Sequence, residues 1–308
     1  MAEVVSPTPQ IFDRALVRRR QLRALALGPS FFLLDRVAHD LADRLAAVLR
    51  HFDVAVDLGT PGAALRTRLH GLGSVDTIVT LDGIPGSGAT AAEKEERHVV
   101  ADEEALPFRD ASLDLVVSAL SLQYVNDIPG VLVQIRRALK PDGLFIAALV
   151  GGETLTELRQ SFAAAESDIE GGASPRVAPF VDVRALGDLL QRAGFALPVA
   201  DADRYTLRYD SAFALMQELR RMGATNALFA RRRMPLRRAT LMRMAEIYAQ
   251  RFADGDGRVR ATFDIVWLSG WAPHESQQQP LKPGSAKARL AEALGAQEIS
   301  AGEKAGRA

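Results

Sequence analysis

Two periodicities of apolar residues divide the chain. Over residues 11–51 the apolar side chains recur mostly at three- and four-residue steps, which is typical of helices with one buried face. The break at Gly28-Pro29-Ser30 splits this stretch, so the pattern predicts two helices. From residue 54 onward, short apolar runs follow one another instead. We expect these runs to form strands at Val54–Leu58, Thr77–Leu81, Arg97–Ala101, Asp114–Ser118 and Leu144–Leu149, with further strands near Arg204–Tyr209 and Thr262–Trp271.

Helical patterns separate most of these strands. They lie near Ala63–His70, Ile128–Leu139, Glu153–Asp168 and Asp182–Ala193, and a glycine-rich loop (Gly83–Gly88) and a short helix (Ala91–Glu96) follow the second strand. Strands that alternate with helices at this spacing imply right-handed crossovers and a mainly parallel sheet covered on both faces. The sequence therefore predicts an α/β fold.

The order of the elements predicts five segments. We expect an N-terminal helical segment (1–51), a sheet-forming core that holds the cofactor (52–209), a helical insertion (210–258), a final strand that completes the core (259–276) and a flexible tail (277–308). The insertion contains two helical patterns, near Ser211–Met222 and Pro235–Phe252.

The composition excludes several classes of function. The 308 residues include no cysteine, so disulfides, thiolate metal sites and cysteine nucleophiles are excluded. The 38 basic and 38 acidic side chains balance, which argues against a surface that coats nucleic acid. No apolar run approaches the roughly 20 residues of a membrane span, and the first ten residues lack the apolar core of a secretory signal. We therefore expect no membrane span and, for a bacterial chain, a cytoplasmic location.

Acidic residues follow three of the expected strands. Ligands of open α/β sheets bind at the carboxyl ends of the strands, where these side chains would meet. Asp82 ends the second strand 25 residues after Asp57, a spacing at which an acidic residue binds a ribose diol. This pattern favours a nucleoside with hydroxyl and amino groups, although Asp57 and Asp82 are also suited to capping helices. The candidate cofactor-binding residues are Asp57, Gly59, Gly62, Asp82, Asp102, Glu103, Ser118 and Leu120.

Five segments resemble the successive motifs of class I S-adenosylmethionine-dependent methyltransferases. They are Val56–Gly62 (VDLGTPG), Thr80–Gly83, Val99–Phe108, Leu113–Asp127 and Leu139–Phe145. The resemblance implies a Rossmann-like, seven-stranded sheet with an antiparallel last strand, and S-adenosyl-L-methionine as cofactor. It also implies that Asp82 binds the ribose hydroxyls, that Asp102 and Glu103 bind the adenine edge, and that the loop from Asp57 to Gly62 binds the methionine moiety.

A second set of segments is similar to a family of respiratory complex I assembly factors shared by mitochondria and bacteria. They are Ile11–Arg14, Gly151–Arg159, Glu170–Phe180, Leu186–Phe195 and Gly270–Gln277. This resemblance implies a complex I subunit as protein client, near the respiratory membrane, and modification of an arginine on it that is described as hydroxylation. The same broader group includes malonyl-[acyl-carrier protein] O-methyltransferases, so an acidic acyl carrier protein is the alternative partner.

The first glycine-rich loop departs from the pattern of the methyltransferases, which reads Asp-Leu-Gly-Cys-Gly-x-Gly. Here Thr60 replaces the cysteine, and Pro61 and Ala63 replace the second and third glycines. Pro61 fixes φ near about −65° and has no N–H to donate, and Ala63 adds a Cβ where the backbone should approach the ligand. A third hypothesis is therefore a non-catalytic assembly factor that has lost the cofactor.

Two residues are candidates for catalysis. Tyr124 follows the fourth strand, near the expected position of a methyl acceptor, and His274 follows the last strand, where it would act as a base or a substrate clamp. The alternatives are a partly buried core aromatic for Tyr124 and a loop hydrogen bond for His274. Methyl transfer needs chiefly in-line positioning and exclusion of water, so a dedicated base is not required. His51-Phe52-Asp53 has part of the spacing of an iron site, but it opens the first strand at its amino end, and we predict no metal site.

The insertion also carries a run of arginines, from Arg231 to Arg238, with Arg220, Arg221 and Arg243 nearby. One interpretation is a solvated face above a stripe of Met and Leu residues. The other is a surface that docks an acidic protein over the crevice, by which we mean the expected ligand site at the carboxyl ends of the strands. The sequence as a whole predicts an S-adenosylmethionine-dependent methyltransferase that modifies or assists a protein client in complex I assembly.

Overall fold

The computed structural model describes residues 10–84, 97–278 and 295. The chain divides into two units, Met1–Pro273 and His274–Ala308, and the first contains every helix and strand described below. Its strands are β1 Phe52–Leu58, β2 Val75–Asp82, β3 Arg97–Val100, β4 Leu113–Ala119, β5 Leu139–Gly151, β6 Ala196–Tyr209 and β7 Val259–Trp271. Its helices are α1 Arg14–Ala26, α2 Phe32–Ala46, α3 Ala64–Leu72, α4 Ile128–Ala138, α5 Thr156–Glu170, α6 Val183–Arg192, α7 Ala212–Arg221 and α8 Arg238–Phe252, with a 3₁₀ helix at Leu122–Tyr124.

The strands form one seven-stranded sheet in the order β3-β2-β1-β4-β5-β7-β6. The pairs among β1 to β5 are parallel, whereas β7 is antiparallel to both β5 and β6. The predicted Rossmann-like, seven-stranded fold with an antiparallel last strand is thus confirmed. The carboxyl ends of β1, β2, β3 and β4 meet at one edge of the sheet, which is the edge where acidic side chains were predicted.

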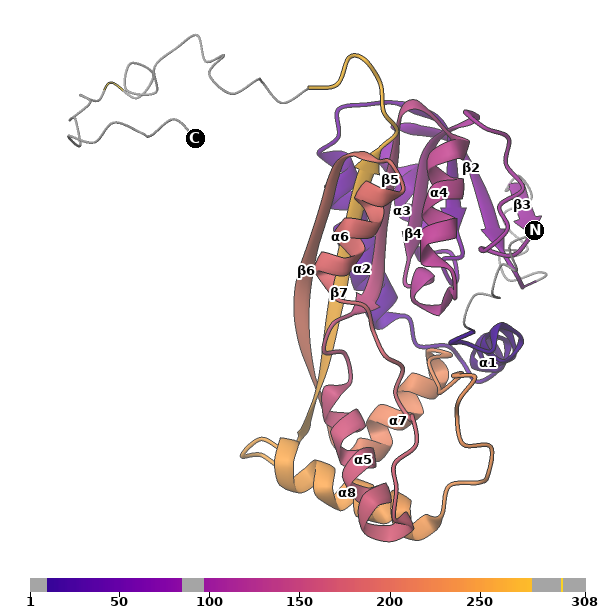
Figure 1. Cartoon of the computed structure of the whole chain (residues 1–308). Helices are drawn as coiled ribbons and strands as arrows, with labels where there is room; N and C mark the ends of the chain where they lie inside the picture. Colours follow the sequence, from indigo (N-terminus) through magenta and orange to yellow (C-terminus); the bar gives the residue numbers. More distant parts are fainter. Residues whose placement is uncertain (1–9, 85–96, 279–294, 296–308) are drawn as a thin grey trace, which may run out of the picture. The chain divides into compact units, whose positions relative to one another are not determined.

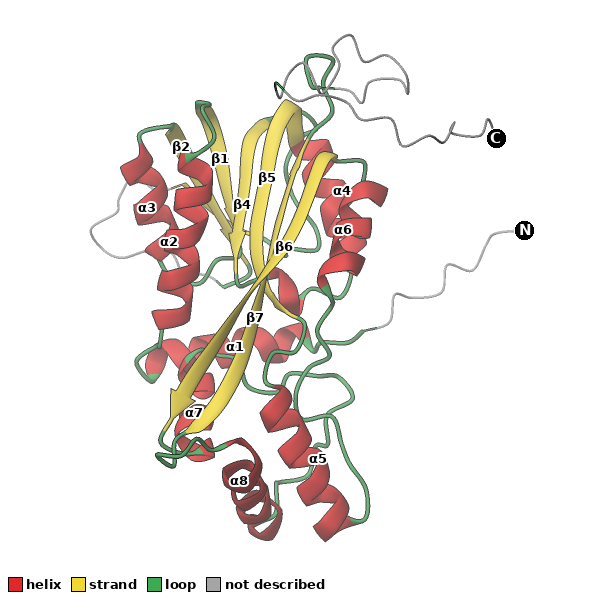
Figure 2. Cartoon of the chain, turned by 90° about the vertical axis from the view of Figure 1, so that its left-hand side faces the viewer, coloured by secondary structure: helices red, strands yellow, loops and turns green. Residues whose placement is uncertain are grey.

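Helices cover both faces of the sheet, α2 and α3 on one and α4 and α6 on the other (Figure 2). The apolar positions of α2 that repeat at helical spacing, among them Val37, Leu41 and Leu45, are fully buried. On the opposite face Leu132 and Ile135 of α4 are equally inaccessible. Since strands covered on both faces are apolar throughout, the unbroken apolar runs of β4 and β5 follow from this arrangement.

A helical cap lies at the carboxyl edge of the parallel strands and consists of α5, α7, α8 and the segment 222–237 (lower part of Figure 1). Helix α5 packs against α8, and α1 packs against α7. Phe12, just before α1, forms an isolated β-bridge with Leu228 of the cap. The cap therefore combines the predicted insertion, which supplies α7 and α8, with the helix that follows β5.

Some boundaries differ from the prediction. Strand β6 begins at Ala196, eight residues before the expected strand, because its first half is an exposed edge strand with polar residues and a proline. The predicted helix at Ala91–Glu96 and most of the loop Gly83–Gly88 lie outside the described residues, as does nearly all of the predicted tail. None of the helices in the described ranges is long and apolar enough to cross a membrane.

Candidate functional site

The loop after β1 forms the centre of the crevice. Gly59 and Gly62 both have φ of +70°, a left-handed conformation that glycine adopts without strain. A Cβ on Gly59 would lie 2.2 Å from Ser121 Oγ and 3.2 Å from Glu103 Cγ. The backbone at Gly59 thus lies against residues that follow β3 and β4, at a distance that leaves no room for a Cβ. Pro61 does not prevent this approach.

Asp57 supports this loop from behind. Its side chain is fully buried, and one of its oxygens lies 3.9 Å from Nη1 of Arg66, a side chain of α3 that is itself 2% exposed. The same Nη1 donates a hydrogen bond of 2.8 Å to the carbonyl of Gly62. Arg66 therefore links the carboxylate at the end of β1 to the turn, and the predicted contact of Asp57 with a ligand stays a prediction.

Ser118 and Thr60 have a similar supporting position. Ser118 is fully buried, and its Oγ donates a hydrogen bond of 2.7 Å to the carbonyl of Leu58. Thr60 Oγ1 accepts a hydrogen bond of 2.9 Å from the amide of Ala119. These bonds fasten β4 to the end of β1 and the start of the loop.

Asp82 lies at the end of β2 and is buried. It accepts a hydrogen bond of 2.7 Å from the amide of Ile84, and its other oxygen lies 3.2 Å from Nε2 of His98 on β3. The predicted contact of Asp82 with the hydroxyls of a ribose stays a prediction.

Asp102 and Glu103, which follow β3, face two arginines of α1. Arg14 Nη2 lies 2.7 Å from Asp102 Oδ1 and also contacts Glu103, and Arg18 Nη2 lies 2.6 Å from Asp102 Oδ2. Burial raises the pKa of Asp102, but the amide of Glu104 and the two guanidinium groups lower it more, so this pKa lies below its ordinary value. Asp102 is therefore ionised at neutral pH, and both carboxylates form ion pairs with arginines of α1.

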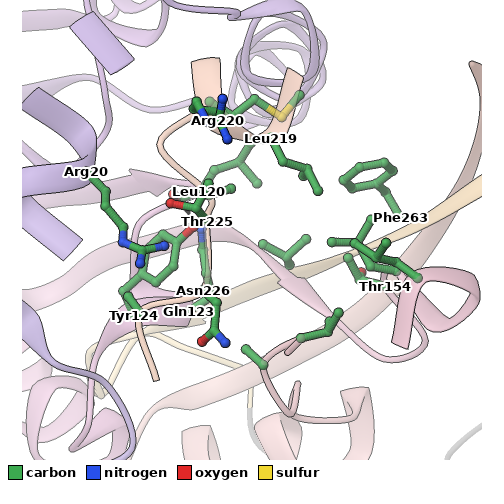
Figure 3. Close-up of a pocket in the computed structure, with 18 of the residues that line it drawn as sticks. Arg20, Leu120, Gln123, Tyr124, Thr154, Leu219, Arg220, Thr225, Asn226 and Phe263 are labelled. Carbon is green, nitrogen blue, oxygen red and sulfur yellow. Dashed lines mark hydrogen bonds between the residues drawn. The ribbon is translucent and has the colours of Figure 1, made fainter. Parts of the chain in front are cut away.

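A cavity of about 490 Å³ lies beside the crevice, and residues of both the glycine loop and the cap line it. We call it the acceptor cavity. Figure 3 shows part of its lining. Its wall includes Pro61 of the glycine loop and Leu120, which follows β4 with φ of +52°. Apolar side chains form most of the rest, among them Phe12, Leu155, Leu158, Phe162, Met216, Leu219 and Phe263. The described residues that line it include three arginines but no aspartate or glutamate.

The polar groups of the acceptor cavity lie mainly on one side. Gln123 is 8% exposed, and its Oε1 has no hydrogen-bond partner among the described residues. Burial raises the pKa of Tyr124 to about 12, and its ring packs edge-on against Phe12 at 5.7 Å. Arg20 lies near Tyr124 (Figure 3). The pKa of Arg20 is lowered by burial and by two nearby positive charges, Arg231 and another arginine of α1. Tyr124 is thus neutral at the cavity wall, as a hydrogen-bond donor.

The arginines of the cavity differ in their partners. Arg176 pairs with the buried Glu166 at 2.5 Å. Within the described part of the chain, neither Arg20 nor Arg220 has a carboxylate within ion-pair distance. Two positive charges at this wall therefore form no ion pair with the described residues.

His274, the second predicted catalytic residue, lies in the second unit. Its Nδ1 is 2.7 Å from Ser276 Oγ, and its carbonyl accepts the amide of Gln277. The preceding strand β7 ends at Trp271 beside Leu144, at the amino end of β5, which is the edge opposite to the crevice. His274 itself belongs to the second unit, and its catalytic role stays a prediction.

The remaining candidates are peripheral. His51, Asp53 and Asp76 gather their ligand atoms within 4.8 Å, but all three are exposed and lie at the amino ends of β1 and β2. Such exposed groups are common without a metal ion, and we assign no metal to them.

The arginine run of the insertion is partly paired within the protein. Arg231 binds Asp13 at 3.2 Å, Arg232 contacts Glu170, and Arg243 binds Asp168 at 2.9 Å. In the described ranges Arg233, Arg237 and Arg238 are exposed and form no ion pair. The run is thus partly paired and partly exposed, and its docking of an acidic protein stays a prediction.

Sequence reasoning missed the contribution of α1. Its helix contains Arg14, Arg18, Arg19, Arg20 and Arg23 without any acidic residue. This imbalance indicates that the helix faces carboxylates elsewhere in the chain. In the structure these are the acids that follow β3. Gln123 was missed because an orphaned side-chain oxygen is visible only in three dimensions.

The fold and the crevice are those of the S-adenosylmethionine-dependent methyltransferase class. A family model described as a methyltransferase domain matches residues 56–147. A solved structure of a methyltransferase from Bacillus halodurans has the same fold, with a TM-score of 0.53 and 16% identity over 77% of this chain and 100% of that chain.

Curated relatives define the family more narrowly. The chain is 39% identical over 288 residues to arginine-hydroxylase NDUFAF5, mitochondrial, of Danio rerio, covering 92% of this chain and 89% of the relative. It is 40% identical over 291 residues to the protein of that name from Homo sapiens, covering 92% and 84%. It is also 34% identical over 269 residues to malonyl-[acyl-carrier protein] O-methyltransferase of Halorhodospira halophila, covering 85% and 89%. The chain belongs to the NDUFAF5 family of methyltransferase-fold proteins.

Proposed function

We propose that this chain binds S-adenosyl-L-methionine in the crevice and transfers its methyl group to an acceptor in the acceptor cavity. The observation that carries this proposal is the continuity of the two sites, because Pro61 and Leu120 belong both to the strand-end loops and to the cavity wall. When bound, the cofactor would supply a methyl group on a sulfonium, which a nucleophile attacks directly.

The residues of the crevice fit such a cofactor. The close approach of Gly59 to Ser121 leaves no room for a Cβ and suits a backbone cradle for the methionine moiety. Asp82 would accept hydrogen bonds from the ribose hydroxyls, and Asp102 and Glu103 would accept them from the adenine edge. The match to the methyltransferase domain over residues 56–147 supports these roles.

The acceptor cavity would position the methyl acceptor and exclude water from it. Its apolar walls exclude water from the space beside the loop, so a bound acceptor would meet the methyl group without competition from solvent. Tyr124, a neutral donor at the wall, would orient the acceptor by a hydrogen bond rather than remove a proton from it. Gln123 Oε1 offers an acceptor group beside it.

The client follows from the family. Relatives at about 40% identity are named arginine hydroxylases, so we propose that the chain modifies or assists a protein client in the assembly of respiratory complex I. Such a client would bring the chain close to the respiratory membrane. The exposed Arg233, Arg237 and Arg238 on the cap suit an acidic region of that client.

A second candidate is O-methylation of a carboxylate on an acyl carrier protein, as the names of other relatives suggest. The charge of the acceptor cavity favours it. The described lining residues include three arginines and no acid, so they would repel a guanidinium substrate. A carboxylate would be attracted by Arg20 and Arg220, which form no ion pair with the described residues.

Calorimetric titration of the purified chain with S-adenosylmethionine tests the cofactor. Saturable binding is expected, and the absence of heat and of a thermal shift at millimolar ligand would leave only a non-catalytic assembly factor. Radiolabelled methyl transfer to malonyl-acyl carrier protein then separates the two candidates. Transfer supports the second. No transfer, together with loss of assembled complex I on gene deletion, supports the first.

A further inference from the structure

Helix α1 carries two arginines into the nucleoside end of the crevice. We propose that α1 is a lid whose Arg14 and Arg18 occupy the place of the adenine ring, so that α1 and the nucleoside exclude one another. This inference rests on the proposed cofactor, but it concerns a helix that lies outside the residues matched to the methyltransferase domain.

Arg18 fills the space beside the end of β2. A Cβ built on Gly83 would lie 2.4 Å from Nε of Arg18 and 2.7 Å from its Cζ, so the guanidinium lies directly on the backbone of Gly83. Its Nη2 reaches Asp102 Oδ2 at 2.6 Å. A single guanidinium thus spans from the end of β2 to the acid after β3, which is the interval in which the base of a nucleoside would lie.

The same arginines take the hydrogen-bond acceptors that the adenine edge would need. Asp102 Oδ1 accepts from Arg14 and from the amide of Glu104, and Asp102 Oδ2 accepts from Arg18. Arg14 also contacts Glu103 and donates to the carbonyl of Tyr124 at 3.2 Å. The guanidinium is a planar set of N–H donors, as is the amino edge of adenine, so the two compete for the same oxygens.

Helix α1 itself buries few side chains, although the residues just before it are hydrogen-bonded to the cap and to the loop after β4. Of its 13 residues only Val17 and Ala24 are buried, while Leu22 and Leu25 are 48% and 40% exposed. Elements with few buried apolar contacts open locally at low cost in free energy. Releasing α1 from the acids is therefore easier than distorting the sheet or the glycine loop.

Movement of α1 would also change the acceptor cavity. Arg20 and Gln21, on the same helix, are part of the cavity wall. A nucleoside that displaces Arg14 and Arg18 would therefore move Arg20 and Gln21 as well, and cofactor binding would reshape this wall of the acceptor cavity. The lid thus links the two sites through one rigid helix.

The test compares Arg18→Gln with Arg19→Gln in the full-length chain, because Arg19 is on the same helix but is exposed and forms no ion pair within the described residues. Calorimetric titration with S-adenosylhomocysteine should give about fivefold tighter binding for Arg18→Gln, the value of one partly exposed ion pair. Arg14→Gln/Arg18→Gln should bind tighter still, and Arg19→Gln should match the wild type. Amide exchange of α1 in the wild type should rise when the ligand is added.

The outcomes are separable. Weaker binding by Arg18→Gln, or slower exchange of α1 on ligand addition, overturns the lid and makes the arginines part of the cofactor site. Equal binding overturns the lid as well and leaves Arg18 without a role in ligand binding. Absence of binding by the wild type and by both arginine variants overturns the lid together with the proposed cofactor. Thermal unfolding of each variant confirms that the protein is folded. Arg18→Lys keeps the positive charge but lacks the planar guanidinium with its paired N–H donors, so it should bind S-adenosylhomocysteine with intermediate affinity.

Discussion

Glu166 is the residue whose loss should disturb the cap most. This carboxylate of α5 is fully buried, and it accepts the amide of Ser174 at 2.6 Å and Nε of Arg176 at 2.7 Å. Through these bonds it holds the segment that carries Arg176, Val177 and Ala178 into the wall of the acceptor cavity. Replacing Glu166 by Gln removes the charge while nearly keeping the shape of the side chain.

The expected cost follows from what the substitution leaves behind. The side chain of Arg176 is 15% exposed, so its guanidinium would lose its only carboxylate partner among the described residues without gaining full hydration. Breaking a buried ion pair from one side costs about 3 kcal/mol or more. Asp168 is a matched control on the same helix, because its pair with Arg243 is exposed on both sides. Asp168→Asn should cost no more than about 0.5 kcal/mol.

Urea denaturation at pH 7 measures both free energies of unfolding. The pH dependence adds a second check, since burial raises the pKa of Glu166 but Ser174 and Arg176 lower it below the ordinary value of 4.5. A lowered folded-state pKa gives stability that is present above pH 4.5 and is lost as the pH falls through the folded-state pKa. The difference between the wild type and Glu166→Gln should therefore be full at pH 7 and shrink below pH 4.5. A cost under about 1 kcal/mol, or equal costs for the two variants, would refute the reasoning.

Three further predictions concern the crevice. Replacing Pro61 and Ala63 together by Gly should tighten binding of S-adenosylmethionine several-fold in calorimetry, since the loop regains an N–H donor; unchanged affinity would mean that Gly62 already suffices. Asp82→Asn should weaken the same binding about tenfold, the value of one charged hydrogen bond, and an unaltered Kd would remove Asp82 from the ribose site. Tyr124→Phe should keep the melting temperature but lower kcat/KM for the acceptor about tenfold in a radiolabel assay, whereas intact kinetics would leave Tyr124 a packing residue only.

Most of the sheet could be predicted from the sequence because its strands are buried on both faces. The apolar runs of β1, β4 and β5 stand out against the polar turns, and Asp57 marks the carboxyl end of β1. The first half of β6 could not be found in this way. It is an edge strand in which exposed and partly buried residues alternate, so its pattern resembles that of a loop.

The crevice was only partly predictable for a different reason. The spacing of Asp82 and Asp102 places them at neighbouring strand ends whatever the loops do, and the structure brings them to the same edge. Which arginine of α1 reaches Asp102 depends on the rotation of the helix, which a stretch with five arginines and few apolar residues does not specify. The wall of the acceptor cavity consists of residues from α1, α2, α5, α7, β5, β7 and several loops, so the cavity exists only once these distant segments are packed together.

Strands β6 and β7 continue past the last residue of β5. Gly151 pairs with Asp264, but the β6–β7 ladder runs on to the pair Tyr209 and Val259. The insertion with α7 and α8 therefore starts and ends on two hydrogen-bonded neighbours at the tip of this ribbon. A change in its length or sequence would therefore leave every pairing within the sheet in place. We expect residues 210–258 to be exchangeable as one block between relatives, with Tyr209 and Val259 as the points of exchange.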